Sequence, residues 1–149
     1  MRTDGQRGSF LNLPSQNNQD LIIDDINFSS GGFSSIKMNG QEVYKFAVRE
    51  VPIIFDNLFR KTNYCSEEVD WFVLHQANQR ILDAVGDRLK IPRKKILSNL
   101  EKYGNTSAAT IPLVMDEAIR NNRIKQNDVI ATSGFGAGLS WGAALIRWG

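Results

Sequence analysis

The sequence predicts an α/β fold in which helices cover the faces of a mixed sheet. Short apolar runs of strand length alternate along the chain with segments whose apolar residues recur at helical spacing. The predicted order is strand, helix, strand, helix, helix, strand, strand, and mixed orders of this kind pack as layers. With 149 residues, 42% of them hydrophobic, the chain is long enough for one domain that buries about 70% of its unfolded surface.

The N-terminal part gives the weakest structural signals. Residues 1–5 are typical of a loop from inside a longer protein, and residues 9–13 alternate in polarity, which predicts a strand that Pro14 ends. Residues 15–35 are rich in Asn, Asp, Ser and Gly, so we expect them to form a long irregular excursion. A short strand and turn over residues 35–40 complete this part.

Residues 41–61 give the clearest periodic signal in the chain. Their apolar residues form one stripe at helical spacing, which predicts an amphipathic helix. Pro52 is expected to kink this helix without ending it, because the stripe continues beyond the proline. The stripe consists of Val43, Phe46, Ala47, Val51, Ile54 and Leu58.

The later elements are shorter and are separated by turn residues or proline. A helix is predicted over residues 78–90, where Ile91-Pro92 stops it, and another over residues 106–121. The remaining predictions are a turn at 66–68, a helical connector at 93–100, a tight turn at 134–138 and strands at 69–74, 129–132 and 140–148.

Two polar residues stand where apolar segments give way to predicted helices. His75 follows Trp71-Phe72-Val73-Leu74, and Asn105 follows Gly104, where it is a candidate helix cap unless Thr106 takes that role. An imidazole and a carboxamide beside positive helix ends suit the stabilisation of an oxyanion, and the helix end favours the neutral imidazole. The plainer alternatives are a lone core or surface histidine and an ordinary cap.

The bulk composition excludes several classes of function. The formal charge of +2 is too small to indicate nucleic-acid binding, and no apolar run reaches the roughly 20 residues of a membrane span. No signal-peptide pattern is present. The single cysteine, Cys65, cannot form an internal disulfide, so we expect a cytoplasmic protein.

Three motifs in order resemble the C-terminal half of β-ketoacyl-acyl carrier protein synthase III, of the thiolase superfamily. They are His75-Gln76-Ala77-Asn78, Gly104-Asn105-Thr106-Ser107-Ala108-Ala109 and Phe135-Gly136-Ala137-Gly138-Leu139-Ser140-Trp141-Gly142. The resemblance covers nearly the whole chain. It implies that residues 1–149 form the C-terminal domain of a layered fold made of two related α/β halves, with the active site between them.

The resemblance also implies a catalytic set divided between the two halves. A cysteine belongs to the N-terminal half, and the histidine and asparagine of the C-terminal half match His75 and Asn105. No family motif surrounds Cys65, so we interpret it as an incidental cysteine. The nucleophile is therefore expected upstream of residue 1, and the chain alone is expected to be inactive.

Further residues match binding positions of the family. The backbone of Ala137 matches a donor of the acyl-transfer oxyanion hole, although a plain glycine-rich hairpin would have the same sequence. A dinucleotide loop is excluded because a strand, not a helix, follows. Asn78 and Arg80 match the pantetheine tunnel and Lys45 its mouth. The basic residues of segment 80–95 could meet the phosphates of coenzyme A or an acidic carrier protein, although such a face is more often simply solvated. Phe135 and Leu139 match the acyl pocket, and core packing is the alternative.

The function that the resemblance implies is condensation in fatty acid synthesis. An acyl group moves from coenzyme A to the cysteine, and malonyl-acyl carrier protein then loses carbon dioxide and attacks. No metal and no cofactor are expected beyond these two substrates. The expected partners are acyl carrier protein, the coenzyme A thioester, the N-terminal half and a second copy in a homodimer. The alternatives are a nonenzymatic homologue that binds acyl carrier or coenzyme A, and a superfamily enzyme of secondary metabolism.

Overall fold

A five-stranded mixed sheet forms the centre of the molecule. The computed structural model describes residues 1–23 and 26–149. The strand order is β1-β9-β8-β6-β7, with β6 parallel to β7 and β8, and β9 antiparallel to β8 and β1. The mixed sheet expected from the sequence is therefore confirmed. The strands are β1 (Arg2–Thr3), β6 (Trp71–Leu74), β7 (Ile96–Leu97), β8 (Val129–Gly136) and β9 (Ser140–Arg147).

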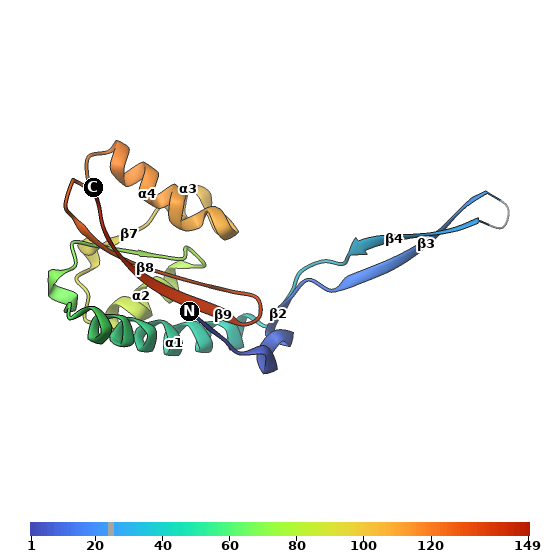
Figure 1. Ribbon diagram of the computed structural model, residues 1–149, viewed down its shortest axis with the longest axis horizontal. Helices are drawn as coiled ribbons and strands as arrows, with labels where there is room; N and C mark the ends of the chain where they lie inside the picture. Colours follow the sequence, from blue (N-terminus) through green and yellow to red (C-terminus); the bar gives the residue numbers. More distant parts are fainter. Residues whose placement is uncertain (24–25) are drawn as a thin grey trace.

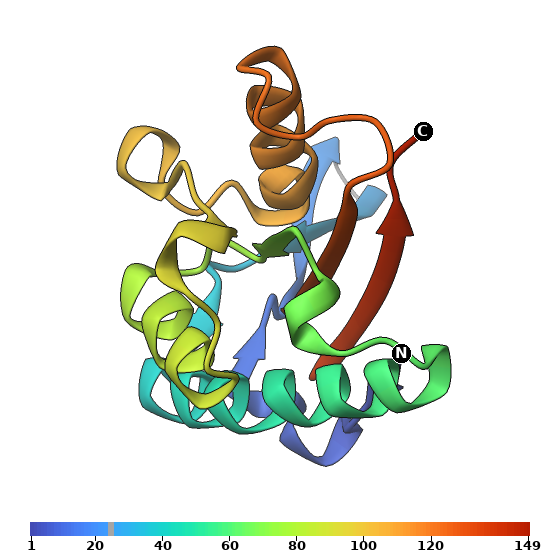
Figure 2. The same cartoon turned by 90° about the vertical axis from the view of Figure 1, so that its left-hand side faces the viewer.

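Helices cover both faces of this sheet, giving three layers. Helices α1 (Gly40–Thr62) and α2 (Gln79–Arg88) lie on one side, and α3 (Leu100–Tyr103) and α4 (Thr110–Arg120) lie on the other (Figures 1 and 2). None of the helices in the described part of the chain is long and apolar enough to cross a membrane.

Strand β6 divides its apolar side chains between two hydrophobic clusters. Phe72 and Leu74 pack with residues of α1 and α2, whereas Val73 packs with Val114 and Ala118 of α4. Successive side chains of a strand point to opposite faces, so a continuous apolar run is what a strand buried on both faces requires. This double burial fixes the end of β6 in the middle of the molecule.

Helix α1 forms where the apolar stripe predicts it and runs through Pro52. The Asn39 side chain caps its start by accepting a hydrogen bond of 3.2 Å from the Glu42 amide. Asn63 ends it in the left-handed conformation, with φ of 56°. Because Pro52 itself is buried with the rest of the stripe, burial outweighs the hydrogen bond that the proline removes.

The prediction of an irregular segment over residues 15–35 is wrong. Strands β3 (Ser15–Ile23) and β4 (Ile26–Phe33) pair antiparallel from Ser15 opposite Phe33, and the hairpin extends away from the three layers (Figure 1). Residues 24–25 lie outside the described residues. Backbone groups of a polar segment can satisfy one another in a two-stranded ladder without an apolar face, so no period appeared in the sequence.

Three other boundaries also differ from prediction. A 3₁₀ helix at Gly5–Phe10 precedes β2 (Leu11–Asn12), which pairs with β5 (Lys37–Met38), so the strand expected at residues 9–13 is reduced to two residues. The expected connector at 93–100 contains strand β7. The helix expected at 106–121 is split, because Ser107 adopts a φ of 53° and α4 starts only at Thr110.

Candidate functional site

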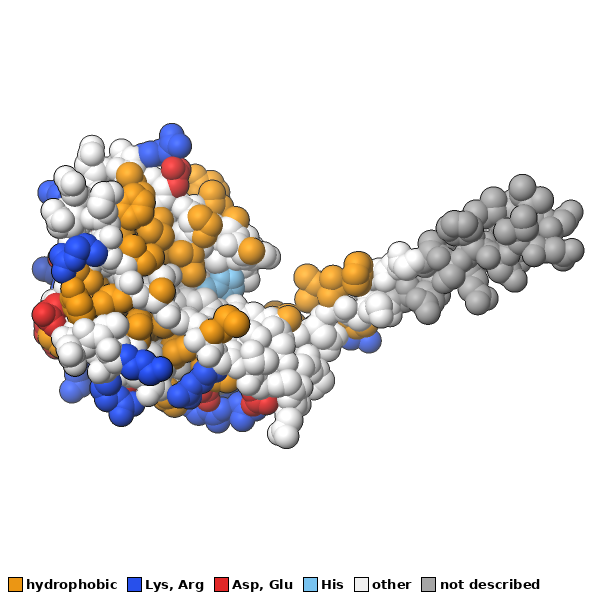
Figure 3. All heavy atoms as spheres, viewed as in Figure 1, with side chains coloured by type: hydrophobic (Ala, Val, Ile, Leu, Met, Phe, Trp, Pro, Cys, Tyr) orange, Lys and Arg blue, Asp and Glu red, His pale blue; other side chains and the backbone are white. Residues whose placement is uncertain are grey.

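A cavity of about 740 Å³ lies where strand β6 ends. Three separate parts of the chain line it: His75 after β6, the segment before α4 that includes Asn105, and the β8–β9 hairpin with Phe135 and Ala137. Apolar residues of the N-terminal part close one side, namely Met1, Leu11, Leu13, Ile36 and Met38. Figure 3 shows the chain's only histidine in pale blue at the surface, with hydrophobic side chains in orange near it.

His75 is held by its backbone and by one aromatic neighbour. Its amide donates a hydrogen bond of 2.8 Å to the Ser133 carbonyl of β8, and its ring meets that of Phe135 edge to face at 5.1 Å. Burial lowers the pKa of His75 below the ordinary value of 6.5. From the sequence, a neighbouring helix end was expected to keep the imidazole neutral. In the structure, burial of the ring away from solvent lowers its pKa instead.

Asn105 reaches the cavity through a turn that needs glycine. Gly104 ends α3 with φ of 64° and ψ of −152°, a conformation that side chains disfavour. The Asn105 Oδ1 atom then accepts a hydrogen bond of 2.9 Å from the Ser107 amide. Thr106 makes no capping hydrogen bond through its side chain, so of the two candidate caps only Asn105 bonds a backbone amide of the turn. Because its oxygen is engaged, Asn105 has its NH₂ group to offer as a donor.

The β8–β9 hairpin supplies the third wall. Strand β8 continues to Gly136, so the tight turn is shorter than predicted, and Ala137 in the turn lines the cavity with Phe135. Gly138 in this turn has a φ of 137°, and a Cβ atom added to it would lie only 2.6 Å from Ser140 Oγ. Leu139 is fully buried in the core instead of lining the cavity. The packing alternative therefore describes Leu139.

The predicted tunnel residues lie outside the cavity lining. Asn78 caps α2, its Oδ1 accepting a hydrogen bond of 3.0 Å from the Ile81 amide. The Arg80 guanidinium lies 5.3 Å from the centre of the Tyr44 ring, and Lys45 forms an ion pair of 2.8 Å with Glu42. The structure thus brings His75, Asn105, Phe135 and Ala137 together, but not Asn78, Arg80, Lys45 or Leu139.

Much of the basic segment at 80–95 is used within the molecule. Arg88 donates a hydrogen bond of 3.1 Å to the Val48 carbonyl, and Lys95 donates one of 2.6 Å to the Val69 carbonyl. Arg93 lies 3.5 Å from Asp83. These contacts favour a structural role for Arg88, Arg93 and Lys95. The segment's six basic residues are Arg80, Arg88, Lys90, Arg93, Lys94 and Lys95.

Cys65 does not have the lowered thiol pKa of an activated nucleophile. It is exposed beside a separate hollow of about 810 Å³, which His75 and Asn105 do not line. Hydrogen bonding to Glu68 raises the pKa of its thiol, which disfavours the reactive thiolate. Within residues 1–23 and 26–149, no three His, Cys, Asp or Glu side chains gather as metal ligands.

Sequence reasoning assigned no role to several polar residues at the site. Gln76, Thr110 and Ser133 are buried. The Gln76 amide donates a hydrogen bond to the Thr110 hydroxyl, and the Gln76 side chain donates one to the Leu74 carbonyl. The Ser133 hydroxyl donates one to the Gly142 carbonyl of β9. Gln76 and Thr110 stand in or beside the motifs, so their polarity next to predicted core residues was the available signal. The apolar wall from the N-terminal part had no comparable signal, because its residues belong to short or polar segments.

Comparisons with known proteins agree with the resemblance. The family described as 3-oxoacyl-[acyl-carrier-protein (ACP)] synthase III C terminal matches residues 59–148. The β-ketoacyl-[acyl-carrier-protein] synthase III proteins of Prochlorococcus marinus strains MIT 9312 and MIT 9301 are 87% and 85% identical to the chain over 149 residues. These alignments cover 100% of the chain and 44% of each relative, so the chain spans less than half their length.

Solved structures show the same fold. The β-ketoacyl-[acyl carrier protein] synthase III of Thermus thermophilus superposes with a TM-score of 0.82 at 36% identity, covering 99% of this chain and 44% of that one. The 3-oxoacyl-[acyl-carrier-protein] synthase III of Aquifex aeolicus also superposes with a TM-score of 0.82, at 35% identity.

Proposed function

The chain belongs to the family of 3-oxoacyl-[acyl-carrier-protein] synthase III C-terminal domains, and on that premise we propose that it supplies the decarboxylating half of a condensing acyltransferase of fatty acid synthesis. The observation that carries the proposal is the meeting of His75 and Asn105 on one cavity, although 29 residues separate them in the sequence. Both side chains can donate a hydrogen bond without changing their protonation state.

The proposed reaction uses these donors on the malonyl thioester. When the carboxylate leaves as carbon dioxide, the electron pair of the broken carbon–carbon bond forms an enolate whose negative charge lies on the thioester oxygen. The imidazole N–H of His75 and the NH₂ of Asn105 stabilise that oxygen. The enolate carbon then attacks the acyl group on the nucleophilic cysteine, and the cysteine thiolate leaves. Donors aimed at developing charge act most strongly where water is excluded.

The state of His75 supports this division of roles. Because burial lowers its pKa, the imidazole is neutral at physiological pH and donates a hydrogen bond without carrying charge. A neutral donor can stabilise the enolate without protonating it. Asn105, with its oxygen bonded to the Ser107 amide, presents the same kind of donor. Ala137 would add a backbone amide for the acyl-transfer step, and Phe135 would line the acyl site.

The rest of the proposal concerns groups outside this chain. We place the nucleophilic cysteine in an N-terminal half. Cys65 has a raised thiol pKa, and it lines a different hollow from His75 and Asn105. Coenzyme A thioester and acyl carrier protein would be the substrates, with no further cofactor, and Arg80, Lys45 and Asn78 would contact them from the outer surface. The complete enzyme would be a cytoplasmic homodimer.

Separate rates for the two half-reactions test this function. In the enzyme that joins this chain to a cysteine-bearing half, His75→Ala and Asn105→Ala should each slow carbon dioxide release from malonyl-acyl carrier protein by roughly 10²–10³-fold. Transfer of the acyl group from coenzyme A to the cysteine, followed by mass, should be largely unchanged. Asn57→Ala, on the exposed face of α1, serves as the control.

Two outcomes would contradict the proposal. Equal loss of both half-reactions would show that His75 and Asn105 do not act mainly in decarboxylation. Binding of malonyl-acyl carrier protein without any decarboxylation by the unaltered enzyme would favour a nonenzymatic binding homologue instead.

A further inference from the structure

Gln76, the residue after His75, makes an unusual set of contacts for a polar side chain. It is only 1% exposed, which makes it the most deeply buried polar residue among those described. A buried carboxamide is stable only if its donors and acceptors are paired. The partners of Gln76 therefore show what its burial accomplishes.

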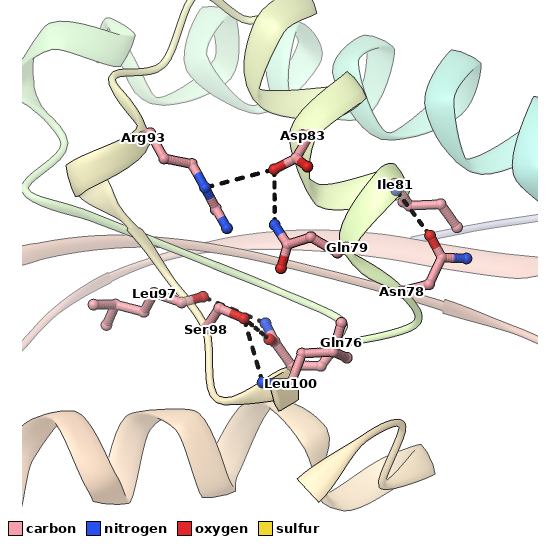
Figure 4. Close-up of polar contacts among 9 residues, drawn as sticks. All are labelled: Gln76, Asn78, Gln79, Ile81, Asp83, Arg93, Leu97, Ser98 and Leu100. Atoms are coloured by element: carbon pink, nitrogen blue, oxygen red, sulfur yellow. Dashed lines mark hydrogen bonds and ion pairs between the residues drawn. The ribbon is translucent and has the colours of Figure 1, made fainter. Parts of the chain in front are cut away.

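The side chain of Gln76 ties the end of β6 to the end of β7. Its Nε2 donates a hydrogen bond of 2.8 Å to the Leu74 carbonyl and a longer one of 3.4 Å to the Leu97 carbonyl. Its Oε1 accepts a hydrogen bond of 2.8 Å from the Ser98 hydroxyl. Ser98 Oγ also accepts a hydrogen bond of 3.3 Å from the amide of Leu100, the first residue of α3 (Figure 4).

These contacts reach the Asn105 turn from both sides. Helix α3, anchored at Leu100 by Ser98, leads through Gly104 directly into Asn105. On the far side of the turn, the backbone amide of Gln76 donates a hydrogen bond of 2.7 Å to the hydroxyl of Thr110, the first residue of α4. One residue adjacent to His75 thus contacts the chain both before and after Asn105.

We propose that Gln76 is a positioning residue that holds the Asn105 carboxamide in register with the His75 imidazole. The inference rests on the proposed function, because it assumes that both donors act on one oxygen. Gln76 itself does not line the cavity, so it acts through the two segments that it joins. Two donors must both lie within hydrogen-bond distance of the developing oxyanion, and small displacements of either one reduce the rate strongly.

The test compares variants in the enzyme that contains this chain and a cysteine-bearing half. Gln76→Met keeps the length of the side chain but removes its hydrogen bonds. Ser98→Ala removes the hydroxyl that joins Gln76 Oε1 to the Leu100 amide, while the bonds from Gln76 Nε2 to Leu74 and Leu97 remain. Each should lower kcat for malonyl-acyl carrier protein decarboxylation by roughly tenfold or more, with KM and cysteine acylation nearly unchanged. Ser98→Thr, which keeps the hydroxyl, should restore the rate.

Gln79→Met is the matched control. The Gln79 carboxamide is also hydrogen-bonded, because its Nε2 donates to Asp83 Oδ1 at 2.7 Å, but Gln79 is exposed on α2. Asp83 in turn pairs with Arg93, so these contacts do not reach Asn105 (Figure 4). This variant should decarboxylate at the unaltered rate. If Gln76→Met does not fold, the pair Ser98→Ala and Ser98→Thr carries the test.

A double-mutant cycle separates this inference from the proposed function. If Gln76 acts through Asn105, adding Gln76→Met to Asn105→Ala should cost less than roughly twofold more, because coupled residues are not additive. Fully multiplicative losses, or equal effects on acylation and decarboxylation, would overturn the positioning role while Asn105→Ala still showed the proposed function to hold. If Asn105→Ala and His75→Ala leave decarboxylation intact, the proposed function itself fails.

Discussion

Among the described residues that line the cavity, His75 has the one titratable side chain. His75 is the only histidine of the chain, and its ring lies half-buried against Phe135 at the end of a strand that is buried on both faces. Burial disfavours the imidazolium form and so lowers the pKa of His75. The same burial that prepares a neutral hydrogen-bond donor therefore makes protonation of the folded chain unfavourable.

This coupling predicts how stability depends on pH. Because the folded-state pKa of His75 is below the ordinary 6.5, the unfolded chain binds a proton more readily. The free energy of unfolding should fall as pH drops below about 6.5 and stop falling from this cause once the buried imidazole is protonated as well. Urea unfolding of the chain across this pH range measures the effect.

His75→Gln is the control for the pH prediction, since it removes the titration while keeping a polar side chain. Its free energy of unfolding should be less dependent on pH between about 7 and 5. An identical pH dependence in the variant would show that His75 makes no contribution.

At the scale of elements, the β8–β9 hairpin depends on Gly138. With φ of 137° and only 2.6 Å between a Cβ atom and Ser140 Oγ, no side chain fits there without displacement. Gly138→Ala should lower the free energy of unfolding by about 1–3 kcal/mol. Gly40 lies at the start of α1, where an added Cβ atom would meet no neighbouring group within 4 Å. Gly40→Ala should instead raise the free energy of unfolding by about 0.4–1 kcal/mol.

Urea denaturation distinguishes these two glycine substitutions by the sign of the change. Shifts of the same sign and size would mean that both variants act only through the entropy of the unfolded chain.

Helix α1 and strand β6 were predictable from the sequence. The stripe of α1 shows the helical period of one buried face, and the continuous apolar run of β6 is what a strand buried on both faces requires. Strand β7 has only two residues, too few to show any period, and β3 and β4 pair through their backbones in a segment rich in Asn, Asp, Ser and Gly. The split before α4 depends on the positive φ of Ser107, which no propensity scale indicates.

The candidate site was predictable only in part. His75 and Asn105 could be chosen because each is polar where an apolar segment ends, and the motifs placed them in order. The directions of Asn78, Arg80 and Lys45 depend on a cap, an aromatic ring and a neighbouring carboxylate, so motif position alone could not place them. The contacts of Gln76 depend on where β7 pairs, which the sequence did not reveal.

At the scale of the whole molecule, one side of the cavity is built from exposed apolar side chains. Leu13, Ile36 and Met38 line the cavity and leave much of their surface in solvent, as does Phe33 at the end of β4. Exposed apolar groups of this kind favour association. The 149-residue chain should therefore self-associate as its concentration rises, as sedimentation velocity would measure.

A matched pair of variants makes the association prediction specific. Ile36→Ser combined with Met38→Ser should reduce self-association, whereas Ile53→Ser, at an exposed apolar site on α1, should leave it unchanged. A chain that remains monomeric at all concentrations would contradict the prediction.

The most direct test is a crystal structure of the enzyme containing this chain and a cysteine-bearing half, bound to a malonyl thioester analogue that cannot decarboxylate. We expect the thioester oxygen to lie about 2.7–3.1 Å from both the His75 ring nitrogen and Asn105 Nδ2. An analogue bound with that oxygen out of reach of either donor would contradict the account.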